Sequence, residues 1–161
     1  DGVDLLRNEK RRSSLVGFVP QDNPLIPELN AWDNLRLWYD RTVLERELKE
    51  GNLSMLGISQ FLKVPVHNMS GGMKKRLSIG CAIAPNPGIL LLDEPSTALD
   101  LACRQSMYEY FRKFRADGGI IIIATHDVQE ISQCSSCYIL KDGGLSPYVY
   151  DGDVSKLIGI M

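Results

Sequence analysis

The sequence predicts an α/β fold with a mostly parallel β-sheet, and two short apolar runs carry this prediction. Residues 89–92 are four consecutive aliphatic residues, and residues 120–123 are four consecutive isoleucines. Runs of this length without polar alternation are typical of strands buried on both faces of a parallel sheet. A helical pattern between them completes a right-handed β-α-β unit, which places the ends of the two strands side by side.

The helix between these strands is predicted over residues 101–115. Asp100 is suited to cap its N-terminus, and Gly118 and Gly119 end it. Its large apolar residues recur at three- and four-residue spacing and form one stripe, which we assign to the core rather than to a binding site. The stripe consists of Met107, Tyr108, Phe111 and Phe114.

Two carboxylates, Asp93 and Glu94, follow directly after the first apolar run. Burying a charge is costly unless the charge is paired or bound to a metal. We therefore expect the strand to deliver both to the polar crevice beyond the carboxyl ends of the strands. One can hold Mg²⁺ while the other accepts a proton from an attacking water. A strand followed by an ordinary acidic turn is the alternative, and this stretch alone favours neither.

A second candidate site is Ser70-Gly71-Gly72, at the start of a predicted helix. Ser70 is suited to an N-cap, and the glycines let backbone amides approach a ligand closely. Three cations follow at positions 74–76, where the helix dipole disfavours positive charge and an anion would offset it. The alternative is an ordinary turn with solvated lysines.

Composition fits a globular chain with one sizeable core. The chain has 161 residues, of which 44% are hydrophobic and 24% charged, and its net charge is −2 with acids and bases interspersed. This charge pattern does not indicate a nucleic-acid partner. No apolar stretch approaches a membrane span, so we expect this chain to be soluble. The four cysteines supply no complete zinc site, and we expect reduced thiols.

Four segments, in this order and at this spacing, resemble the signature loop, Walker B strand, D-loop and switch histidine of an ATP-binding cassette (ABC) ATPase. They are residues 70–78, 89–95, 96–100 and 124–127. The resemblance extends from residue 1 to about residue 145. Met69 and Met73 replace the outer Leu and Gln of the usual Leu-Ser-Gly-Gly-Gln, and this variant is similar to that of ABC-2 type exporters.

The resemblance implies a P-loop NTPase-like fold with an inserted helical subdomain, and a role for each site residue. Asp93 would hold Mg²⁺ and Glu94 would polarise the attacking water. Gln21, in the Q-loop position, would assist at the metal, and with His126 it would complete the shell around the γ-phosphate of ATP. The residues that would contact the nucleotide from the signature loop and D-loop are Ser70, Gly71, Gly72 and Asp100.

Gln21 and His126 have plainer alternatives. Without the neighbouring motifs, Gln21 would be a solvated loop residue. His126 follows the second apolar run, and the β-α-β unit is expected to place it near Asp93 and Glu94. Its alternative is a histidine at a helix start beside a capping box formed by Asp127 and Glu130.

The resemblance divides the chain into three segments. Residues 1–21 lead to the Q-loop, residues 22–84 form the helical subdomain, and residues 85–161 carry the catalytic core. In the helical segment we expect Trp32 and Trp38 to lie in the core, with partial exposure to a partner as the alternative.

No Gly-x-x-x-x-Gly-Lys-Ser/Thr occurs in the 161 residues. This P-loop cradles the β- and γ-phosphates, and in the family it precedes the Q-loop by roughly 40 residues. Because only 20 residues precede Gln21, we expect the N-terminal strands and P-loop to be missing and this chain to be inactive alone.

The implied function is an ATP-binding and ATP-hydrolysing subunit of an ABC transporter, coupled to solute export. The implied partners are a second nucleotide-binding domain and a membrane-spanning permease subunit, and the implied location is cytoplasmic, peripheral on the inner face of the membrane. Two alternatives stay open: a non-transport ABC ATPase of DNA repair or translation, and a non-catalytic folded module.

Overall fold

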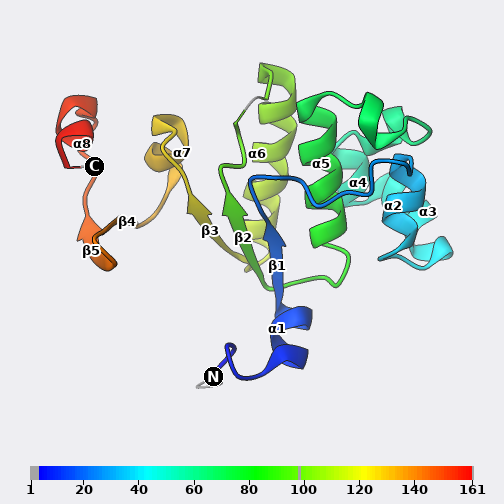
Figure 1. The fold of residues 1–161 in the computed structure, drawn as a ribbon, viewed down its shortest axis with the longest axis horizontal. Coiled ribbons are helices and arrows are strands. Elements are labelled where there is room, and N and C mark those ends of the chain that lie inside the picture. The colour runs from blue at the N-terminus through cyan, green and yellow to red at the C-terminus, as the bar shows by residue number, and fades with distance from the viewer. Residues whose placement is uncertain (1–3, 98, 161) are drawn as a thin grey trace. The chain divides into compact units, whose positions relative to one another are not determined.

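The computed structural model describes residues 4–97 and 99–160, and the chain divides into two compact units, residues 1–123 and 124–161. The α-helices are α1 (Glu9–Leu15), α2 (Ala31–Arg36), α3 (Arg41–Glu50), α4 (Asn52–Met55), α5 (Gly71–Ala82), α6 (Leu101–Ala116), α7 (Val128–Gln133) and α8 (Val154–Ile160) (Figure 1). The 3₁₀ helices are η1 (Ile58–Phe61) and η2 (Val66–Asn68). The strands are β1 (Val16–Val19), β2 (Ile89–Asp93), β3 (Ile120–Ala124), β4 (Cys137–Lys141) and β5 (Gly144–Tyr148).

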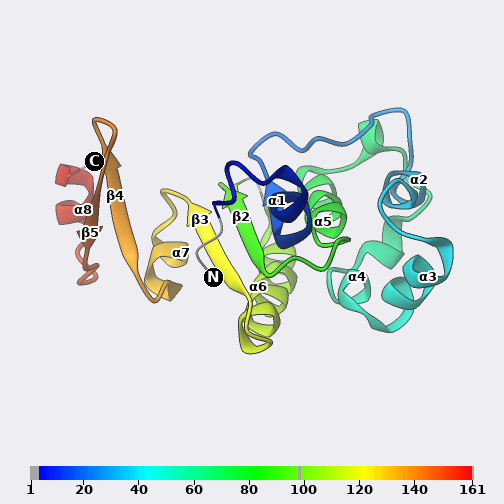
Figure 2. The same ribbon diagram turned by 90° about the horizontal axis from the view of Figure 1, so that it is seen from below.

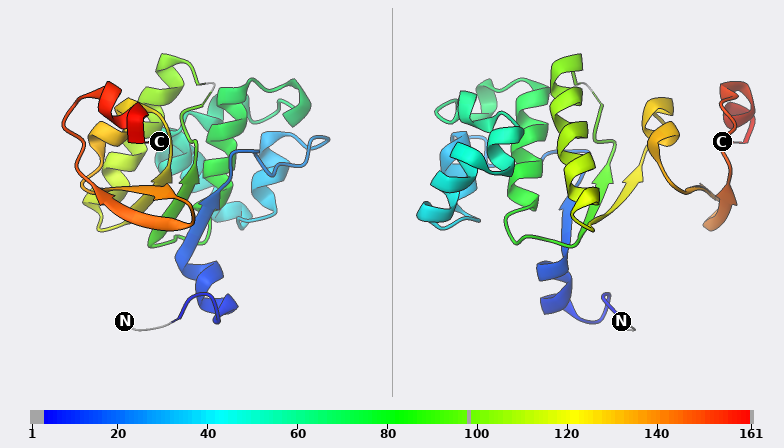
Figure 3. Two further views of the ribbon diagram at one scale, coloured as in Figure 1. Left: turned by 60° about the vertical axis from the view of Figure 1, so that its left-hand side comes forward. Right: turned by 180° about the vertical axis from the view of Figure 1, so that it is seen from behind.

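The first unit is built on a three-stranded sheet of order β1-β2-β3. Strands β1 and β2 are parallel, with a register that runs from Val16 opposite Ile89 to Val19 opposite Leu92. The arrows of all three strands point the same way in Figures 1 and 3. Since α6 connects β2 to its neighbour β3, the predicted β-α-β unit and α/β fold are confirmed.

Helices α5 and α6 lie on one face of this sheet (Figure 3, right). Strand residues that point to this face, such as Val19, Leu90 and Leu92, are buried. The opposite face is open, because Phe18, Ile120 and Ile122 are 55 to 57% exposed. The prediction that the strands are buried on both faces is therefore wrong. Four apolar residues in a row reflect strand propensity here, while the helices cover only alternate positions.

The helices that follow β1 pack on α5, and their buried residues belong to the same core as those of the sheet (Figure 2). The residues at the centre of this helical region are aliphatic and fully buried: Leu35, Leu44, Leu53, Ile58 and Leu77. Gly57 separates α4 from η1, and its φ of +66° favours glycine.

The two tryptophans of this region differ in burial. Trp32 is half-buried and packs against the core. Trp38 is 64% exposed and its neighbour Leu37 is 58% exposed, so the prediction that Trp38 lies in the core is wrong. Helix α2 ends at Arg36, and Tyr39 takes the inward position instead. The Tyr39 hydroxyl donates to the Gly80 carbonyl oxygen at 2.9 Å, and burial raises the pKa of this phenol above its usual value.

The second unit contains α7, the antiparallel hairpin of β4 and β5, and α8. Lys141 pairs with Gly144, and the two turn residues Asp142 and Gly143 have φ of 50° and 75°, as a type I′ turn requires. All four cysteines are free in the structure. Among the described helices, none combines the length and the apolar character of a membrane span.

Candidate functional site

The candidate site residues of the first unit gather at the carboxyl edge of the sheet. Val19 lies opposite Leu92 in neighbouring parallel strands, so Gln21 and the pair Asp93-Glu94 leave the sheet at the same edge. Helices α5 and α6 both begin at this edge, as Figures 1 and 3 show. Ser70 and Asp100, which cap these two helices, are therefore presented to the same side as the carboxylates.

Glu94 has an unusual backbone conformation. Its φ of +45° lies in the left-handed region, which costs a non-glycine residue on the order of 1–3 kcal/mol and persists where surroundings enforce it. Pro95 and Ser96 are buried directly after it. Thr97 holds the turn, since its amide donates to the Glu94 carbonyl oxygen at 3.3 Å and its hydroxyl donates to Glu94 Oε2 at 3.2 Å. These two bonds hold the Glu94 backbone and its carboxylate to Thr97.

The Ser-Gly-Gly segment forms the N-terminus of α5. Ser70 caps the helix as predicted, with its Oγ accepting from the Met73 amide at 3.2 Å. Gly71 is exposed, whereas Gly72 is buried. A Cβ at Gly72 would lie 2.8 Å from Cys103 Sγ, so glycine is needed there for α5 to pack on α6. Sequence reasoning assigned Gly72 to ligand approach and missed this packing role.

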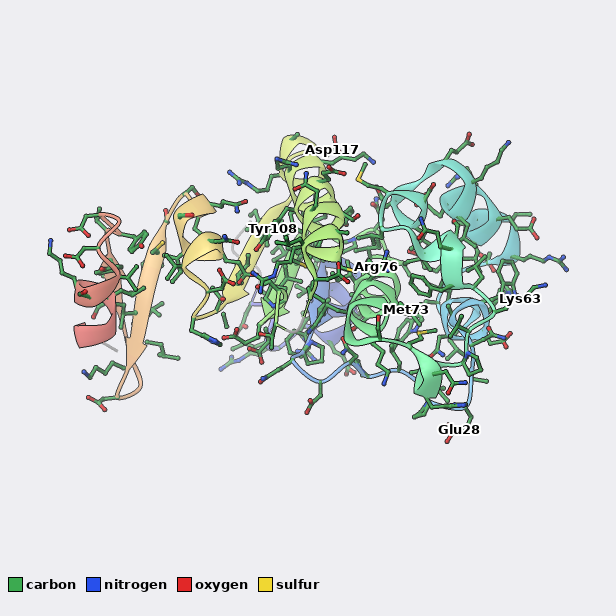
Figure 4. All side chains as sticks on the ribbon, turned by 90° about the horizontal axis from the view of Figure 1, so that it is seen from above. Glu28, Lys63, Met73, Arg76, Tyr108 and Asp117 are labelled. Atoms are coloured by element: carbon green, nitrogen blue, oxygen red, sulfur yellow. The ribbon has the colours of Figure 1, made fainter. Side chains whose placement is uncertain are left out.

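Asp100 caps α6 and is bonded twice to one residue. Its Oδ1 accepts from the Cys103 amide at 2.8 Å, and its Oδ2 accepts from the Cys103 thiol at 3.3 Å. These hydrogen bonds, with a smaller contribution from the charge of Arg76, lower the pKa of the Asp100 carboxyl. Burial, followed by the bond to Asp100, raises the pKa of the Cys103 thiol. Figure 4 shows Arg76 on α5 next to α6.

The loop that contains Gln21, residues 20–26, is called the Gln21 loop. Lys75 joins it to α5 by hydrogen bonds. The Gln21 side chain is exposed, but its carbonyl oxygen accepts from Lys75 Nζ at 3.2 Å, and the Pro20 carbonyl oxygen accepts from the same nitrogen at 3.1 Å. Lys75 is only 3% exposed, so the alternative of solvated lysines is wrong for this one. Nothing in the local sequence separates Lys75 from Lys74, because its burial depends on a loop more than 50 residues away.

His126 lies in the second unit, and its side chain is exposed. Asp127 caps α7 by accepting from the Gln129 amide at 2.8 Å, while its own amide donates to Thr125 Oγ1 at 2.9 Å. The capping box named in the alternative for His126 is not formed, because both oxygens of Glu130 are buried without a hydrogen-bond partner. The position of His126 beside Asp93 and Glu94 stays a prediction.

The residues at the sheet edge fit a magnesium ion by their chemistry. Mg²⁺ prefers oxygen ligands and retains several waters, so one carboxylate and one amide oxygen are a sufficient protein contribution when phosphate supplies the rest. Asp93 and Gln21 offer these two groups at one edge. Within residues 4–97 and 99–160, no group of three His, Cys, Asp or Glu side chains forms a self-contained metal site.

The fold and this edge define a class of protein: an α/β core with a parallel sheet and a helical segment that presents a Ser-Gly-Gly helix N-terminus. The sequence model of one family, described as ABC transporter, matches residues 1–97, which is more than half of the chain. The chain belongs to this family, and the resemblance given by the four motifs is confirmed.

Two relatives indicate the kind of ABC protein to which the chain is similar. It is 26% identical over 164 residues to the probable multidrug ABC transporter ATP-binding protein YbhF of Escherichia coli (strain K12), across 99% of this chain. It is 35% identical over 135 residues to the Nod factor export ATP-binding protein I of Sinorhizobium fredii, across 81% of this chain. The matches span 28% and 39% of the length of these curated relatives.

Solved structures confirm the fold. The dimeric post-hydrolysis state of the ATP-binding cassette MJ0796, bound to ADP and Pi, superposes with a TM-score of 0.74 at 29% identity, over 89% of this chain and 66% of that one. An ATP-binding subunit of an ABC transporter superposes with a TM-score of 0.77 over 99% of this chain and 68% of that one. At 23% identity, this second likeness supports the fold alone.

Proposed function

We propose that the chain is part of an ATP-binding and ATP-hydrolysing subunit of an ABC transporter that powers solute export. The observation that carries the proposal is the strained Glu94, which directly follows Asp93 at the edge where Gln21 also emerges. Strain of this kind clusters at catalytic turns. The relatives, a probable multidrug transporter protein and a Nod factor export protein, favour transport over DNA repair or translation.

In the proposed mechanism each residue at the edge has one task. Asp93 and Gln21 would hold Mg²⁺, which when bound offsets the negative charge of the ATP phosphates. Glu94 orients the attacking water and polarises it toward the γ-phosphate, since it is the residue directly after Asp93 at the end of β2. His126, after β3, is proposed to donate to a γ-phosphate oxygen or to orient Glu94.

The Ser-Gly-Gly end of α5 is proposed to act on ATP held by a second nucleotide-binding domain. Ser70 and the first amides of α5 are at a helix N-terminus, which favours an anionic phosphate through its free N–H groups and its dipole. Asp100 would contribute from the adjacent start of α6, where its carboxylate is held by Cys103. Dimerisation of two such domains would bring these groups to the partner's nucleotide.

The exposed pair Leu37 and Trp38 supports a protein partner on the helical segment. Large apolar side chains that are adjacent and exposed are typical of interaction surfaces. We propose that a membrane-spanning permease subunit docks here, which would place the protein peripherally on the inner, cytoplasmic face of the membrane. The division into residues 1–21, 22–84 and 85–161 is part of this proposal, with the middle segment as the one that docks.

The test is Glu94→Gln in the complete protein. The neutral amide keeps the shape of the side chain but polarises water poorly, so Mg-ATP binding should remain nearly intact while turnover falls by a factor on the order of 10² or more. Single-turnover ATPase assays and nucleotide titrations measure the two effects separately. Glu50→Gln, at the exposed end of α3, is the matched control. Unchanged turnover in Glu94→Gln would rule out the proposed role.

A further inference from the structure

The contact between Lys75 and the Gln21 loop joins two functional segments that are distant in sequence. The Lys75 ammonium donates to the carbonyl oxygens of Pro20 and Gln21 at 3.1 and 3.2 Å, across sequence separations of 55 and 54 residues. The side chain is 97% buried, since its exposed fraction is 3%. A buried ammonium is costly unless it is hydrogen-bonded, and charge-assisted bonds are the stronger kind. The two hydrogen bonds from Lys75 therefore hold the loop to α5 stably.

The far end of the same loop is also anchored. Asn34 of α2 is 2% exposed, and its Oδ1 accepts from the Ile26 amide at 2.9 Å. Its Nδ2 donates to the Ile26 carbonyl oxygen at 3.3 Å and to the Asn30 carbonyl oxygen at 3.0 Å. The segment from Pro20 to Ile26 is thus bonded to α5 at one end and to α2 at the other.

Helix α5 can carry a displacement from Lys75 to its own N-terminus. Lys75 is the fifth residue of the helix, little more than one turn after Ser70. The following turns are held in the core, because Leu77 and Ile79 are fully buried and Gly80 packs against Ile58. A displacement at Lys75 therefore acts on the first turn, whose Gly72 packs on Cys103 of α6.

From these contacts we infer that Lys75 is a positioning residue that couples the Gln21 loop to residues 70–72. A partner that docks beside Trp38 and shifts the loop would move the phosphate-facing end of α5 through the Lys75 bonds. The inference rests on the proposed function for what residues 70–72 contact. The link between loop and helix is a property of this chain's own contacts and can be tested without nucleotide.

The first experiment measures amide hydrogen exchange in the complete protein without ATP. Lys75→Met removes the ammonium while keeping an unbranched side chain, and it should raise exchange in residues 20–26 and in residues 71–74 together. Lys74→Met removes the same charge one residue earlier, from a half-buried side chain, and should leave exchange in residues 20–26 unchanged. Equal effects of both variants, or a rise confined to one of the two segments in Lys75→Met, would overturn the inference.

The second experiment measures ATP turnover with and without the permease subunit. Lys75→Met should lower the stimulation by the permease about tenfold and change KM for ATP less than about twofold, because coupling between sites typically amounts to 5- to 150-fold. Lys75→Arg keeps charged donors and should recover stimulation to within about threefold of wild type. Full stimulation in Lys75→Met would overturn the inference.

Two further results keep the test decisive. If Lys75→Met does not fold, Lys75→Gln and Lys75→Arg provide the same contrast, and equal stimulation in these two variants would overturn the inference. A wild-type protein that hydrolyses no ATP would refute the proposed function instead. The exchange experiment would still decide whether Lys75 links the loop to α5.

Discussion

At the scale of single residues, Cys103 determines both how Asp100 caps α6 and how strongly the Asp100 carboxyl holds its proton. Its two oxygens accept from the amide and the thiol of Cys103, and these bonds lower the pKa of its carboxyl. A carboxyl whose folded pKa is depressed stabilises the fold above its unfolded pKa of about 3.9, and this contribution is lost as the pH falls through the folded value.

Replacing Cys103 by alanine should therefore raise the pKa of Asp100 while keeping the backbone cap. The thiol bond is lost, but the amide of residue 103 still donates to Oδ1. Carboxyl ¹³C NMR titration of Asp100 measures the midpoint directly. Cys134→Ala, at the exposed end of α7, should leave that midpoint where it is in the wild type. A midpoint in Cys103→Ala that equals the wild-type value would show that the thiol bond does not form.

Helix caps were predictable from sequence, because a cap is decided within four residues. Ser70 and Asp100 each accept from the amide three residues later, as predicted. The left-handed Glu94 and the buried Lys75 were not predictable. The burial of Lys75 depends on a loop from another part of the chain, and no residue type in the Glu94 turn marks a left-handed conformation, which is rare outside glycine.

At the scale of elements, α5 is the helix through which the parts of the first unit meet. One side contacts β1 and α6, and the other contacts α2 and η1. Gly80 allows the approach on the second side, since a Cβ there would lie 2.8 Å from Ile58 Cδ1 and 3.0 Å from Leu53 Cδ2. Its carbonyl oxygen also accepts the Tyr39 hydroxyl.

Gly80→Ala should destabilise the chain by about 1–3 kcal/mol, as is usual when an atom is forced into a packed core. Ile58→Val removes the Cδ1 atom nearest to the new methyl group and alone should cost about 0.5–1.5 kcal/mol. In the double variant the methyl group enters the space that Cδ1 left, so the combined loss should be smaller than the sum. Urea denaturation of the wild type, the two single variants and the double variant gives the four free energies of unfolding that make up the double-mutant cycle. Strictly additive losses would contradict this account of Gly80.

The sequence predicted the order of helices and strands because their apolar periods are local. It could not predict which faces are covered. Four isoleucines in β3 have the same pattern whether one or two layers of helices pack on the strand, and two of them are more than half exposed. Trp38 was misplaced for a related reason, since α2 ends before it and Tyr39 fills the core position.

At the scale of the whole molecule, the first unit is a sheet with helices α5 and α6 on one face and an apolar opposite face. The exposed side chains on that face come from both outer strands, Phe18 of β1 and Ile120 and Ile122 of β3. Contiguous exposed apolar surface and unpaired strand edges promote association. The relatives and the solved structures are longer than this chain. The matched region spans 28% and 39% of the two relatives, and 66% and 68% of the two solved structures.

We expect the 161-residue chain to self-associate through this face at micromolar concentrations. Threonine keeps the β-branched shape of isoleucine while adding a hydroxyl, so Ile120→Thr with Ile122→Thr should weaken association about tenfold or more without removing β3. Leu140→Thr, on the β4–β5 hairpin, is the control, because Leu140 is 73% exposed and belongs to a different sheet. Sedimentation velocity at protein concentrations between about 1 and 100 μM measures how strongly each variant associates. A wild-type chain that stays monomeric across this range, or a control that suppresses association as strongly as the double variant, would show that this face does not drive contact between copies.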